Sequence, residues 1–421
     1  MTRGPAVFGW FVALAVTAAA RAEDWPGFRG PTGQGISSEK GLPVKWADED
    51  NVAWKVAVPA EGWSSPVVVG DRVFLTGTTE KGVSCRVVCI DRKKGSVLWN
   101  KEAMRQELRN KNPRNSYATP TPAADSKRVY AVFSDGGIAA LDHAGKVLWT
   151  NRDVKHYSQH GLGASPLLYK DLLVMPYDGS SAGPDKKVGW QTPWDKAVVL
   201  AVDVATGKEK WRGKRGMSRI SHMTPIVVKV DGKDQIVSAG GDVVQGFDPP
   251  TGKRLWSVTS SGEGVSPSPV AGEGLVFTSS GFGDPHVRAV RPGDAKGAGA
   301  KIVWEDKNAV PTIPSMIHVK PHLFSVSTDG IAQCFKAADG ERLWRQRLGG
   351  TYSASPLYAD GKLYFLNDAG ETTVIEAAAK YKQLHKNALG ERCQASIAAS
   401  RGQLFIRTEK HLYCIGKARK G

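Results

Sequence analysis

The 421-residue chain contains only five cysteines, and none of them is adjacent to another or part of a C-x-x-C pair. It therefore lacks the usual signatures of a zinc site, a thiol–disulfide redox centre and an attached haem. It also lacks the G-x-S-x-G turn of α/β-hydrolases and a Walker-type phosphate loop. After residue 20, no apolar run is long enough to cross a bilayer. These absences leave no catalytic motif to build on.

Glycine and tryptophan are abundant by contrast, with 47 and 13 copies. The clearest repeating unit runs from Ala201 through Asp203 and Gly207 to Trp211. An apolar strand ending at Asp, a short loop with Gly and a second strand bearing Trp are typical of a β-hairpin. Recurrence every 40 to 62 residues indicates a repeat protein. The recurring tryptophans are expected to pack their rings against the neighbouring unit; they are Trp54, Trp99, Trp149, Trp211, Trp256, Trp304 and Trp344.

Each unit opens with a small-residue, Ser/Thr and usually Pro element, and there are eight openings but only seven complete hairpins. The last unit ends near Ile415 without its Trp strand, while the chain begins with an unpaired one at Trp54. We therefore predict an all-β, eight-bladed β-propeller of four-stranded antiparallel blades, closed by the N-terminal strand. An open sandwich array and an α/β repeat are the alternatives, which the scarcity of helical periodicity disfavours. The openings lie at residues 64–66, 118–120, 164–166, 223–225, 266–267, 314–315, 354–356 and 395–396.

The N-terminus is predicted to be a separate segment. An apolar stretch of about fifteen residues follows Arg3 and ends in a small-x-small site at residues 20–22, which favours a signal peptide over a membrane span of roughly twenty residues. No cysteine lies nearby, so we expect no lipid anchor. We predict a signal peptide at 1–22, an extension at 23–50, one propeller at 51–417 and a basic tail at 418–421. The mature protein is expected to be periplasmic or extracellular, without a transmembrane segment.

The net charge of +16 bears on the choice of partner. In an exported protein, acidic surfaces are better candidates than nucleic acid. We expect an envelope protein or an acidic polymer as partner, no nucleic acid, and a monomer; a merely solubilising surface is the alternative. The densest basic cluster, between Lys101 and Arg114, carries mixed charges typical of a short solvated helix.

The cysteines follow the repeat. Cys89, Cys334 and Cys414 occupy one repeat position, where other units place small residues, so we expect buried packing groups. Cys85 and Cys89 are too far apart on an extended strand for a disulfide. The sequence leaves a disulfide between cysteines of neighbouring blades as an alternative and assigns no pair.

The unit at residues 201–211, its degenerate copies and the Ser-Pro openings resemble the pyrroloquinoline-quinone-like (PQQ-like) propeller repeat, over residues 25–415. This family includes calcium-dependent quinoprotein alcohol dehydrogenases and non-catalytic members, notably the propeller of the bacterial outer-membrane assembly machinery. The chain resembles the second group more. Residues 25–31 are also similar to the N-terminal signature of exported members, to which we attach no chemistry.

The resemblance to the dehydrogenases implies adjacent bridged cysteines over the cofactor, a catalytic Asp and calcium ligands. This chain has no such cysteine pair and is shorter than the dehydrogenases. Aspartates followed by turn residues favour turns over a catalytic base. We therefore predict no catalytic residue, no metal and no cofactor, with a soluble oxidoreductase that uses PQQ and calcium as the alternative. The aspartates considered are Asp178, Asp195, Asp329 and Asp368.

We therefore expect an exported, non-catalytic scaffold that binds a protein or a ligand at the cell envelope, with outer-membrane protein assembly as the narrower version that the resemblance implies. Residues just before each innermost strand are expected to surround one mouth of the central channel, where aromatic and imidazole groups suit a small ligand or a protruding peptide. The alternative is that these side chains only fill the channel entrance as packing residues. The insertion at residues 179–197 carries Trp190 and Trp194, which we expect to contact a partner; the alternative is that they fold back as a small local core. A carbohydrate binder is a third class. The expected mouth residues are Trp63, Tyr117, His160, His222, Tyr352 and Cys393.

Overall fold

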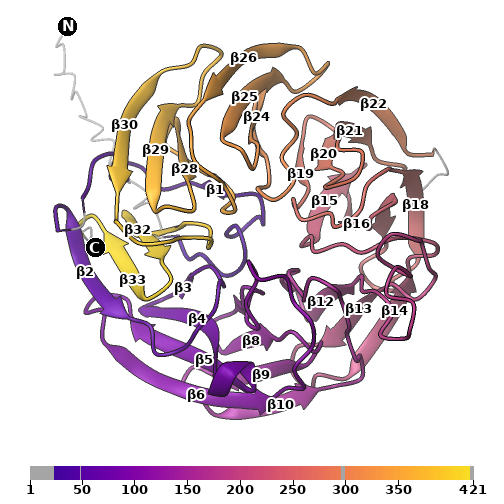
Figure 1. Ribbon diagram of the computed structural model, residues 1–421, viewed down its shortest axis with the longest axis horizontal. Coiled ribbons are helices and arrows are strands. Elements are labelled where there is room, and N and C mark those ends of the chain that lie inside the picture. Colours follow the sequence, from indigo (N-terminus) through magenta and orange to yellow (C-terminus); the bar gives the residue numbers. More distant parts are fainter. Residues whose placement is uncertain (1–22, 48, 295–298, 418–421) are drawn as a thin grey trace, which may run out of the picture.

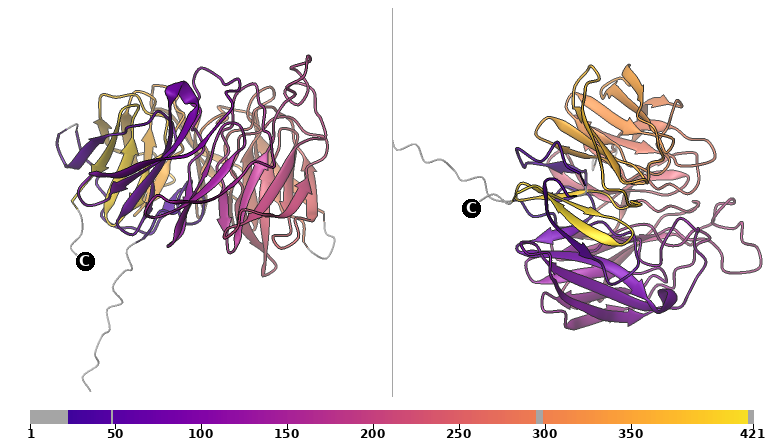
Figure 2. Two further views of the ribbon diagram at one scale, coloured as in Figure 1. Left: turned by 90° about the horizontal axis from the view of Figure 1, so that it is seen from below. Right: turned by 60° about the vertical axis from the view of Figure 1, so that its left-hand side comes forward.

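The computed structural model describes residues 23–47, 49–294 and 299–417. Eight antiparallel sheets stand around a ring in chain order, as Figure 1 shows. Figure 2 shows the ring from two further sides, with the strands of each blade crossing its thickness. The predicted all-β propeller of eight four-stranded blades is confirmed.

The blades are numbered in chain order, and each runs from its innermost to its outermost strand. The first four are blade 1, β3 (Val67–Val69), β4 (Arg72–Thr79), β5 (Ser84–Asp91) and β6 (Val97–Arg105); blade 2, β7 (Ala123–Ala124), β8 (Arg128–Val132), β9 (Ile138–Asp142) and β10 (Val147–Asn151); blade 3, β11 (Leu167–Tyr169), β12 (Leu172–Tyr177), β13 (Val198–Asp203) and β14 (Glu209–Lys214); and blade 4, β15 (Ile226–Val230), β16 (Lys233–Ala239), β17 (Val243–Phe247) and β18 (Arg254–Thr259).

The other four blades complete the ring. They are blade 5, β19 (Val270–Gly272), β20 (Leu275–Ser279), β21 (Val287–Arg291) and β22 (Lys301–Asp306); blade 6, β23 (Ile317–Val319), β24 (His322–Val326), β25 (Ile331–Lys336) and β26 (Arg342–Arg347); blade 7, β27 (Leu357–Ala359), β28 (Lys362–Leu366), β29 (Glu371–Glu376) and β30 (Gln383–Ala388), with β1 (Ile36–Ser37) added in parallel to β27; and blade 8, β31 (Ala398–Ser400), β32 (Gln403–Arg407), β33 (His411–Ile415) and β2 (Val52–Ala57).

The N-terminal strand closes the ring as predicted. β2 pairs with β33 in antiparallel register and supplies the outermost strand of blade 8. Figure 1 shows indigo β2 beside yellow β33. The two ends of the propeller are therefore held together by a main-chain ladder, which leaves no open end in the ring.

The recurring hairpin needs its glycine for two reasons, as Gly207 in blade 3 shows. Its φ is +71°, a left-handed conformation that costs glycine little. A Cβ there would also lie 2.4 Å from the ring of Trp149, which covers the hairpin from blade 2. The Asp203 carboxylate fixes the turn by accepting the N–H groups of Ala205 and Thr206 at 3.0 and 2.9 Å. The spacing from Asp to Gly to Trp is thus explained by turn geometry and blade docking together.

The tryptophans join neighbouring blades. In six of the seven, the indole N–H donates to a backbone carbonyl of the next blade at 2.8–3.1 Å. Trp256 instead donates to the Gln235 amide oxygen at 2.6 Å, and the Gln235 amide nitrogen donates to the Gly293 carbonyl of blade 5 at 3.1 Å. Six indoles are therefore hydrogen-bonded directly to the next blade, and the seventh is linked to it through Gln235.

Blade 7 has His385 where the other blades place tryptophan. The N-terminal extension supplies the indole instead, since Trp46 is 2% exposed and stacks on Tyr364 with a centroid distance of 6.5 Å. The amide of Asn387 on β30 holds the extension there, accepting from Trp46 N at 2.8 Å and donating to the Val44 carbonyl at 3.0 Å. A segment outside the repeat thus replaces the missing repeat residue.

The repeat position of the cysteines is the partner of the tryptophan across the third and fourth strands. Cys89, Cys334 and Cys414 pair in register with Trp99, Trp344 and Trp54. All five cysteines are buried and none forms a disulfide. Burial raises the pKa of Cys89, Cys334 and Cys393 to about 12. The prediction that the three repeat cysteines are packing residues agrees with this placement.

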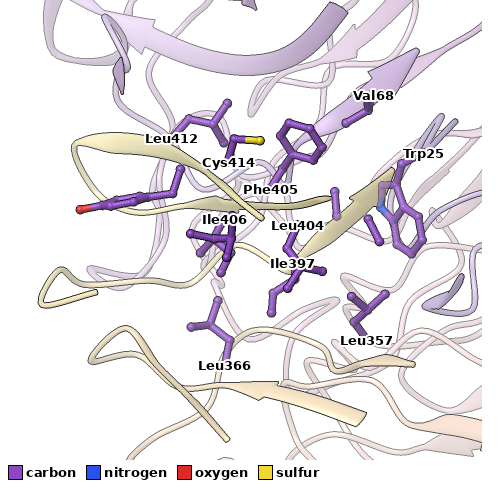
Figure 3. Close-up of a cluster of buried hydrophobic side chains, with 14 of the residues drawn as sticks. Trp25, Val68, Leu357, Leu366, Ile397, Leu404, Phe405, Ile406, Leu412 and Cys414 are labelled. Carbon is purple, nitrogen blue, oxygen red and sulfur yellow. The ribbon is translucent and has the colours of Figure 1, made fainter. Parts of the chain in front are cut away.

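The largest hydrophobic cluster lies where blades 7, 8 and 1 meet. Figure 3 shows Trp25 beside Val68 and Leu357, with Phe405 and Cys414 further along blade 8. The N-terminal extension therefore adds core residues at the junction that closes the ring.

The predicted short helix in the basic cluster is wrong. Lys101 and Arg105 lie on β6, and residues 106–112 have no regular structure. The charged side chains of Lys101, Glu102 and Arg105 occupy exposed positions of β6, on either side of the buried Ala103 and Met104. Within the part of the chain that the structure describes, no helix is long and apolar enough to cross a membrane. The predicted signal peptide at 1–22 and basic tail at 418–421 lie outside the described residues.

Candidate functional site at the channel mouth

A closed ring of hydroxyl groups surrounds the middle of the channel. The Ser or Thr of each blade opening accepts the backbone N–H of its counterpart in the preceding blade, at 2.8–3.0 Å, and the eighth bond returns from Ser396 to Ser65. We call these residues the hydroxyl tier. Its members are Ser65, Thr121, Ser165, Thr224, Ser268, Ser315, Ser355 and Ser396.

The residue two positions before each hydroxyl also lines the channel, because alternate residues of an extended chain face the same side. These eight positions form a second layer above the hydroxyls, which we call the variable tier. Unlike the hydroxyl tier, it mixes aromatic, imidazole, amide, hydroxyl and aliphatic groups. Its members are Trp63, Thr119, Gly163, His222, Ser266, Ile313, Ser353 and Gln394.

The other end of the channel is covered by residues 23–39, which we call the strap. Phe28 of the strap lines the channel below the hydroxyl tier. Main-chain groups of the strap pair with Val68 of blade 1, Ala124 of blade 2 and Tyr358 of blade 7. In Figure 1 the indigo trace around β1 reaches into the middle of the ring. Residues 25–31, which sequence analysis left without a role, thus form part of a cover over one face.

Arg29 ties the strap to blade 6. Arg29 is 1% exposed, and its guanidinium donates to the Met316 carbonyl at 2.6 Å and to the Gln34 carbonyl at 2.8 Å. Burial lowers the pKa of Arg29 to about 9. The Gln34 amide oxygen accepts from Ala271 N of blade 5 at 2.7 Å. The strap therefore bonds to blades on both sides of the channel, which leaves the opposite mouth as the open end.

The mouth has a narrow inner part and a wider outer groove. The inner part, bounded by the two tiers, Phe28, Arg114 and Asn115, encloses about 160 Å³. The outer groove encloses about 450 Å³ and extends towards blades 3 to 5. The groove is within the size range of ligand pockets, whereas the inner part suits a narrow group. The residues that line the groove include His160, Trp190, His222, Glu263, Phe282 and Ile313.

Aromatic groups and cations meet around this mouth. The Arg392 guanidinium lies 5.2 Å from the ring centre of Trp63, which is a cation–π distance. Trp190 meets His160 edge to face, with ring centroids 5.3 Å apart, and Phe282 on the far side of the groove is 47% exposed. No carboxylate of the described residues lies within 4 Å of the Arg114 guanidinium. The rim thus offers apolar surface and positive charge together.

His222 faces both the inner part and the groove. Neither of its ring nitrogens has a hydrogen-bond partner among the described residues. Burial, and then the charges of His160 and His156, lower the pKa of His222 to about 3. Burial also lowers the pKa of His160, against the opposing effect of Glu263, and lowers that of His156 to about 4. His222 is therefore a neutral imidazole whose two ring nitrogens are themselves buried beside the channel.

The structure brings together Trp63, His160, His222 and Trp190 from the sequence-predicted set. Tyr117 packs over Gly82 outside the channel. Trp194 packs on Gly189 within its own loop.

Tyr352 and Cys393 must be corrected, because both are buried, at 1% and 0% exposure, within the blades. Each lies three positions before its hydroxyl, and an odd offset turns a side chain of an extended segment away from the channel.

Two openings were also assigned two residues too early. Residues 119–122 read Thr-Pro-Thr-Pro and residues 266–269 read Ser-Pro-Ser-Pro, so each contains two matches to the opening pattern. The hydroxyl tier uses the second match, Thr121 and Ser268, while Thr119 and Ser266 belong to the variable tier. Sequence analysis missed Arg114, Phe282, Arg392 and Gln394. The offset of two from each tier hydroxyl would have found Gln394, whereas the other three lie on connections with no repeat signal.

The residues do not fit a calcium-assisted cofactor site. Calcium takes six to eight oxygen ligands, largely from carboxylates. Among the described residues that line the inner part and the groove, Glu263 alone is acidic, and its carboxylate lies 3.8 Å from the Arg219 guanidinium. Within the same described ranges, no three His, Cys, Asp or Glu residues come together as a metal site.

The four aspartates considered as a catalytic base lie elsewhere or are already engaged. Asp178 is buried against Arg215, whose Nη2 donates to Asp178 Oδ2 at 2.8 Å. Asp195 is exposed beside Lys196, and Asp329 lies in an exposed turn. Asp368 accepts from the variable-tier Ser353 at 3.0 Å, and burial raises the pKa of Asp368. This arrangement of carboxylates shows no paired acid and base facing the channel.

Comparison with known proteins agrees with this architecture. A family model described as outer membrane protein assembly factor BamB matches residues 44–194, 195–318 and 287–410. The chain belongs to this BamB family. The predicted resemblance to a PQQ-like propeller, closer to the outer-membrane assembly propeller than to the dehydrogenases, is confirmed.

Two solved structures share the fold of this BamB-family chain. BamB from Moraxella catarrhalis is 12% identical with a TM-score of 0.60, and the match covers 87% of this chain and 99% of that one. The computationally designed Ika8 protein is 11% identical with a TM-score of 0.60, covering 86% of this chain and 98% of that one. At these identities the likeness concerns the fold alone.

A curated relative has a different description. The 1-butanol dehydrogenase (quinone) of Thauera butanivorans is 27% identical over 195 residues, which are 42% of this chain and 28% of that enzyme. The chain therefore spans less than a third of the length of this relative.

Proposed function

We propose that this BamB-family protein is an exported, non-catalytic scaffold that binds a protein partner at the cell envelope through the open mouth of its channel. The observation that carries the proposal is the difference between the channel's ends: the strap covers one, while the other presents Trp63, Trp190 and Phe282 around an accessible groove. Aromatic anchors beside arginine are typical of protein-binding surfaces.

The polarity of the mouth favours an acidic segment of the partner. Arg114 contributes positive charge at the rim, as does Arg392, which also lies 4.0 Å from the Glu409 carboxylate. The hydroxyl tier contributes donors further in. Glu263, the acidic residue that lines the groove, already faces Arg219. Charge complementarity of this kind increases the association rate and selects against basic partners.

The narrower version of the proposal is a role in outer-membrane protein assembly, in which the propeller recruits or positions an assembly partner. It is supported by the description of the family to which the chain belongs. Export, which the N-terminal sequence predicts, is a requirement of this version.

A quinone-dependent oxidoreductase is the second candidate, favoured by the 27% identity to the butanol dehydrogenase. The absence of a calcium-ligand set among the described lining residues weighs against it. Calorimetric titration of the folded protein with PQQ, with and without calcium, separates the two candidates. We expect no binding in either condition; tight, calcium-dependent, stoichiometric binding would favour the oxidoreductase.

Site-specific photo-crosslinking tests the scaffold proposal. A photoreactive phenylalanine analogue replaces Phe282 at the groove, and in a matched control it replaces Leu98 on the outer strand β6; the two side chains are 47% and 48% exposed. In the native cell envelope we expect one discrete adduct from position 282 and none from position 98. Mass spectrometry then identifies the partner and the crosslinked segment, which we expect to be acidic.

Two additional conditions define the result. Trp63→Ala should abolish the adduct from position 282 without changing the melting temperature by more than a few degrees, and raising the ionic strength should weaken it. Equal adducts from positions 282 and 98, or an adduct that Trp63→Ala does not affect, would contradict binding at the mouth.

A further inference from the structure

The two ends of the strap meet at blade 8. The backbone nitrogen of Glu23 lies 3.2 Å from Glu39 Oε1. The Glu23 carboxylate also reaches across, accepting from Ser37 Oγ at 2.6 Å and Ser38 N at 3.0 Å. The Glu23 carbonyl accepts from Ser400 Oγ at 2.6 Å. The strap is therefore a loop whose base is fastened by contacts of Glu23.

Glu39 is held in a pocket for an anion. It is 7% exposed, and its carboxylate accepts Arg401 N at 2.8 Å and Gly402 N at 3.0 Å. Both donors belong to the β31–β32 turn, where the φ angles of Arg401 and Gly402 are +54° and +77°. Successive N–H groups in such turns form anion-binding concavities. Glu39 is thus bound as a carboxylate at the innermost turn of blade 8.

This buried carboxylate has no cationic side chain beside it. Among the described residues, no Lys, Arg or His nitrogen lies within 4 Å of its oxygens, because the Arg401 guanidinium turns to Asp24, 3.3 Å away. A buried charge without a counter-charge is costly. The remaining donor to Glu39 is Glu23 N, which is neutral as a peptide nitrogen and becomes an ammonium when Glu23 is the first residue of the chain.

We propose that hydrolysis of the peptide bond between Ala22 and Glu23 is a maturation step that fastens the strap. Water adds across the bond, residue 22 takes the new carboxylate, and Glu23 takes the amine, which binds a proton. The resulting α-ammonium forms an ion pair with Glu39. The small-x-small pattern of residues 20–22 independently predicts cleavage at this bond. The inference concerns the closed face and does not depend on which partner the mouth binds.

The groups around Glu23 N define the pH dependence. The facing carboxylates are Glu39, the Glu23 side chain and Asp24, and the facing cation is Arg401. An opposite charge within hydrogen-bond distance raises the pKa of an amine by about one unit or more. We therefore expect the α-amine of the mature protein to titrate well above its ordinary value of about 7.7–8.0.

The first test measures that pKa from the pH dependence of α-amine acylation in the protein that begins at Glu23. We expect a pKa at least about one unit higher than in the Glu39→Gln variant. Equal values near 8 in the two proteins would overturn the proposal. N-terminal sequencing of the exported protein should give Glu23 first, and a different first residue would also overturn it.

A second test uses the unchanged sequence, so that it does not depend on the folding of the variant. An N-acetylated form and the free-amine form are compared by urea unfolding at pH 7, where we expect acetylation to raise the unfolding constant about tenfold. Because the folded pKa is raised, this difference should be complete below about pH 7.7 and should disappear as the pH rises through the folded value. Identical unfolding curves at pH 7 would overturn the proposal.

Discussion

The two ends of the channel are built from different kinds of chain. One continuous segment, residues 23–39, covers the closed end, with Trp25 and Arg29 each 1% exposed. The open end is assembled from separate connections, which bring Trp63, Trp190 and Arg392 together from blades 1, 3 and 8. The closed end therefore depends on burial and stabilises the ring, whereas the open end leaves side chains accessible for recognition.

Removal of the N-terminal segment, which forms the closed end, should destabilise the protein more than any other change considered. Deletion of residues 23–58 removes the strap and also β2, the strand that completes blade 8. We expect the protein to unfold or to oligomerise through the exposed edge of β33. Circular dichroism melting and size-exclusion chromatography measure this, and an unchanged melting curve with a monomeric elution would disprove closure by the N-terminal strand.

Tryptophan substitutions compare the two ends directly. Trp25→Ala at the closed end should lower the free energy of unfolding by about 3–5 kcal/mol, as should Trp211→Ala between blades 3 and 4, because both are buried. Trp190→Ala at the open end should cost less than about 1 kcal/mol, because the side chain is only partly buried. Urea denaturation gives all three values. Similar losses at Trp25 and Trp190 would remove the distinction.

Acid should destabilise the open end through His222. Its folded pKa of about 3 lies below the ordinary value near 6.5, so the unfolded state takes up the proton first. Stability is therefore complete above about pH 6.5 and falls as the pH is lowered towards 3, by about 3 kcal/mol at pH 4.5. His222→Asn should remove this part of the acid sensitivity. A pH profile parallel to that of the wild type would contradict the burial of a neutral imidazole.

The smallest effect on stability is expected at the rim. Arg392→Ala removes the cation over Trp63 and should cost at most about 1 kcal/mol of unfolding free energy. The same substitution should markedly reduce crosslinking from position 282, because it removes positive charge at the mouth. Lys382→Ala, at an exposed residue of blade 7, is the control and should change neither quantity. A loss of several kcal/mol on Arg392→Ala would make Arg392 a structural residue.

Sequence reasoning identified what the repeat encodes. The blade number, closure by β2 and the shared position of Cys89, Cys334 and Cys414 were accessible because the same contact recurs in several blades. Features made by single segments were not accessible. Trp46, which lies outside the repeat, replaces the missing indole of blade 7. Arg392 near the C-terminus contacts Trp63 near the N-terminus, a pair that occurs once and follows no repeat.

Only part of the candidate site could be predicted from the sequence, for a related reason. Successive side chains of each extended segment face the channel and the blade core in turn. An error of one residue in the register therefore places a core residue in the channel, as happened for Tyr352. The doubled patterns at residues 119–122 and 266–269 hid the register further, because either Ser or Thr satisfies the motif. The register became visible only through the hydrogen bond between Ser65 and Thr121 and its seven equivalents.

The hydroxyl tier also fixes the bore of the channel. Its eight links of 2.8–3.0 Å form a hoop without ends, so the opening cannot widen at one blade without stretching bonds at its neighbours. The fixed width at this level therefore limits the cross-section of any group that enters the channel. The inner part of about 160 Å³ therefore suits a slender group of a guest, while the groove of about 450 Å³ can hold a larger one.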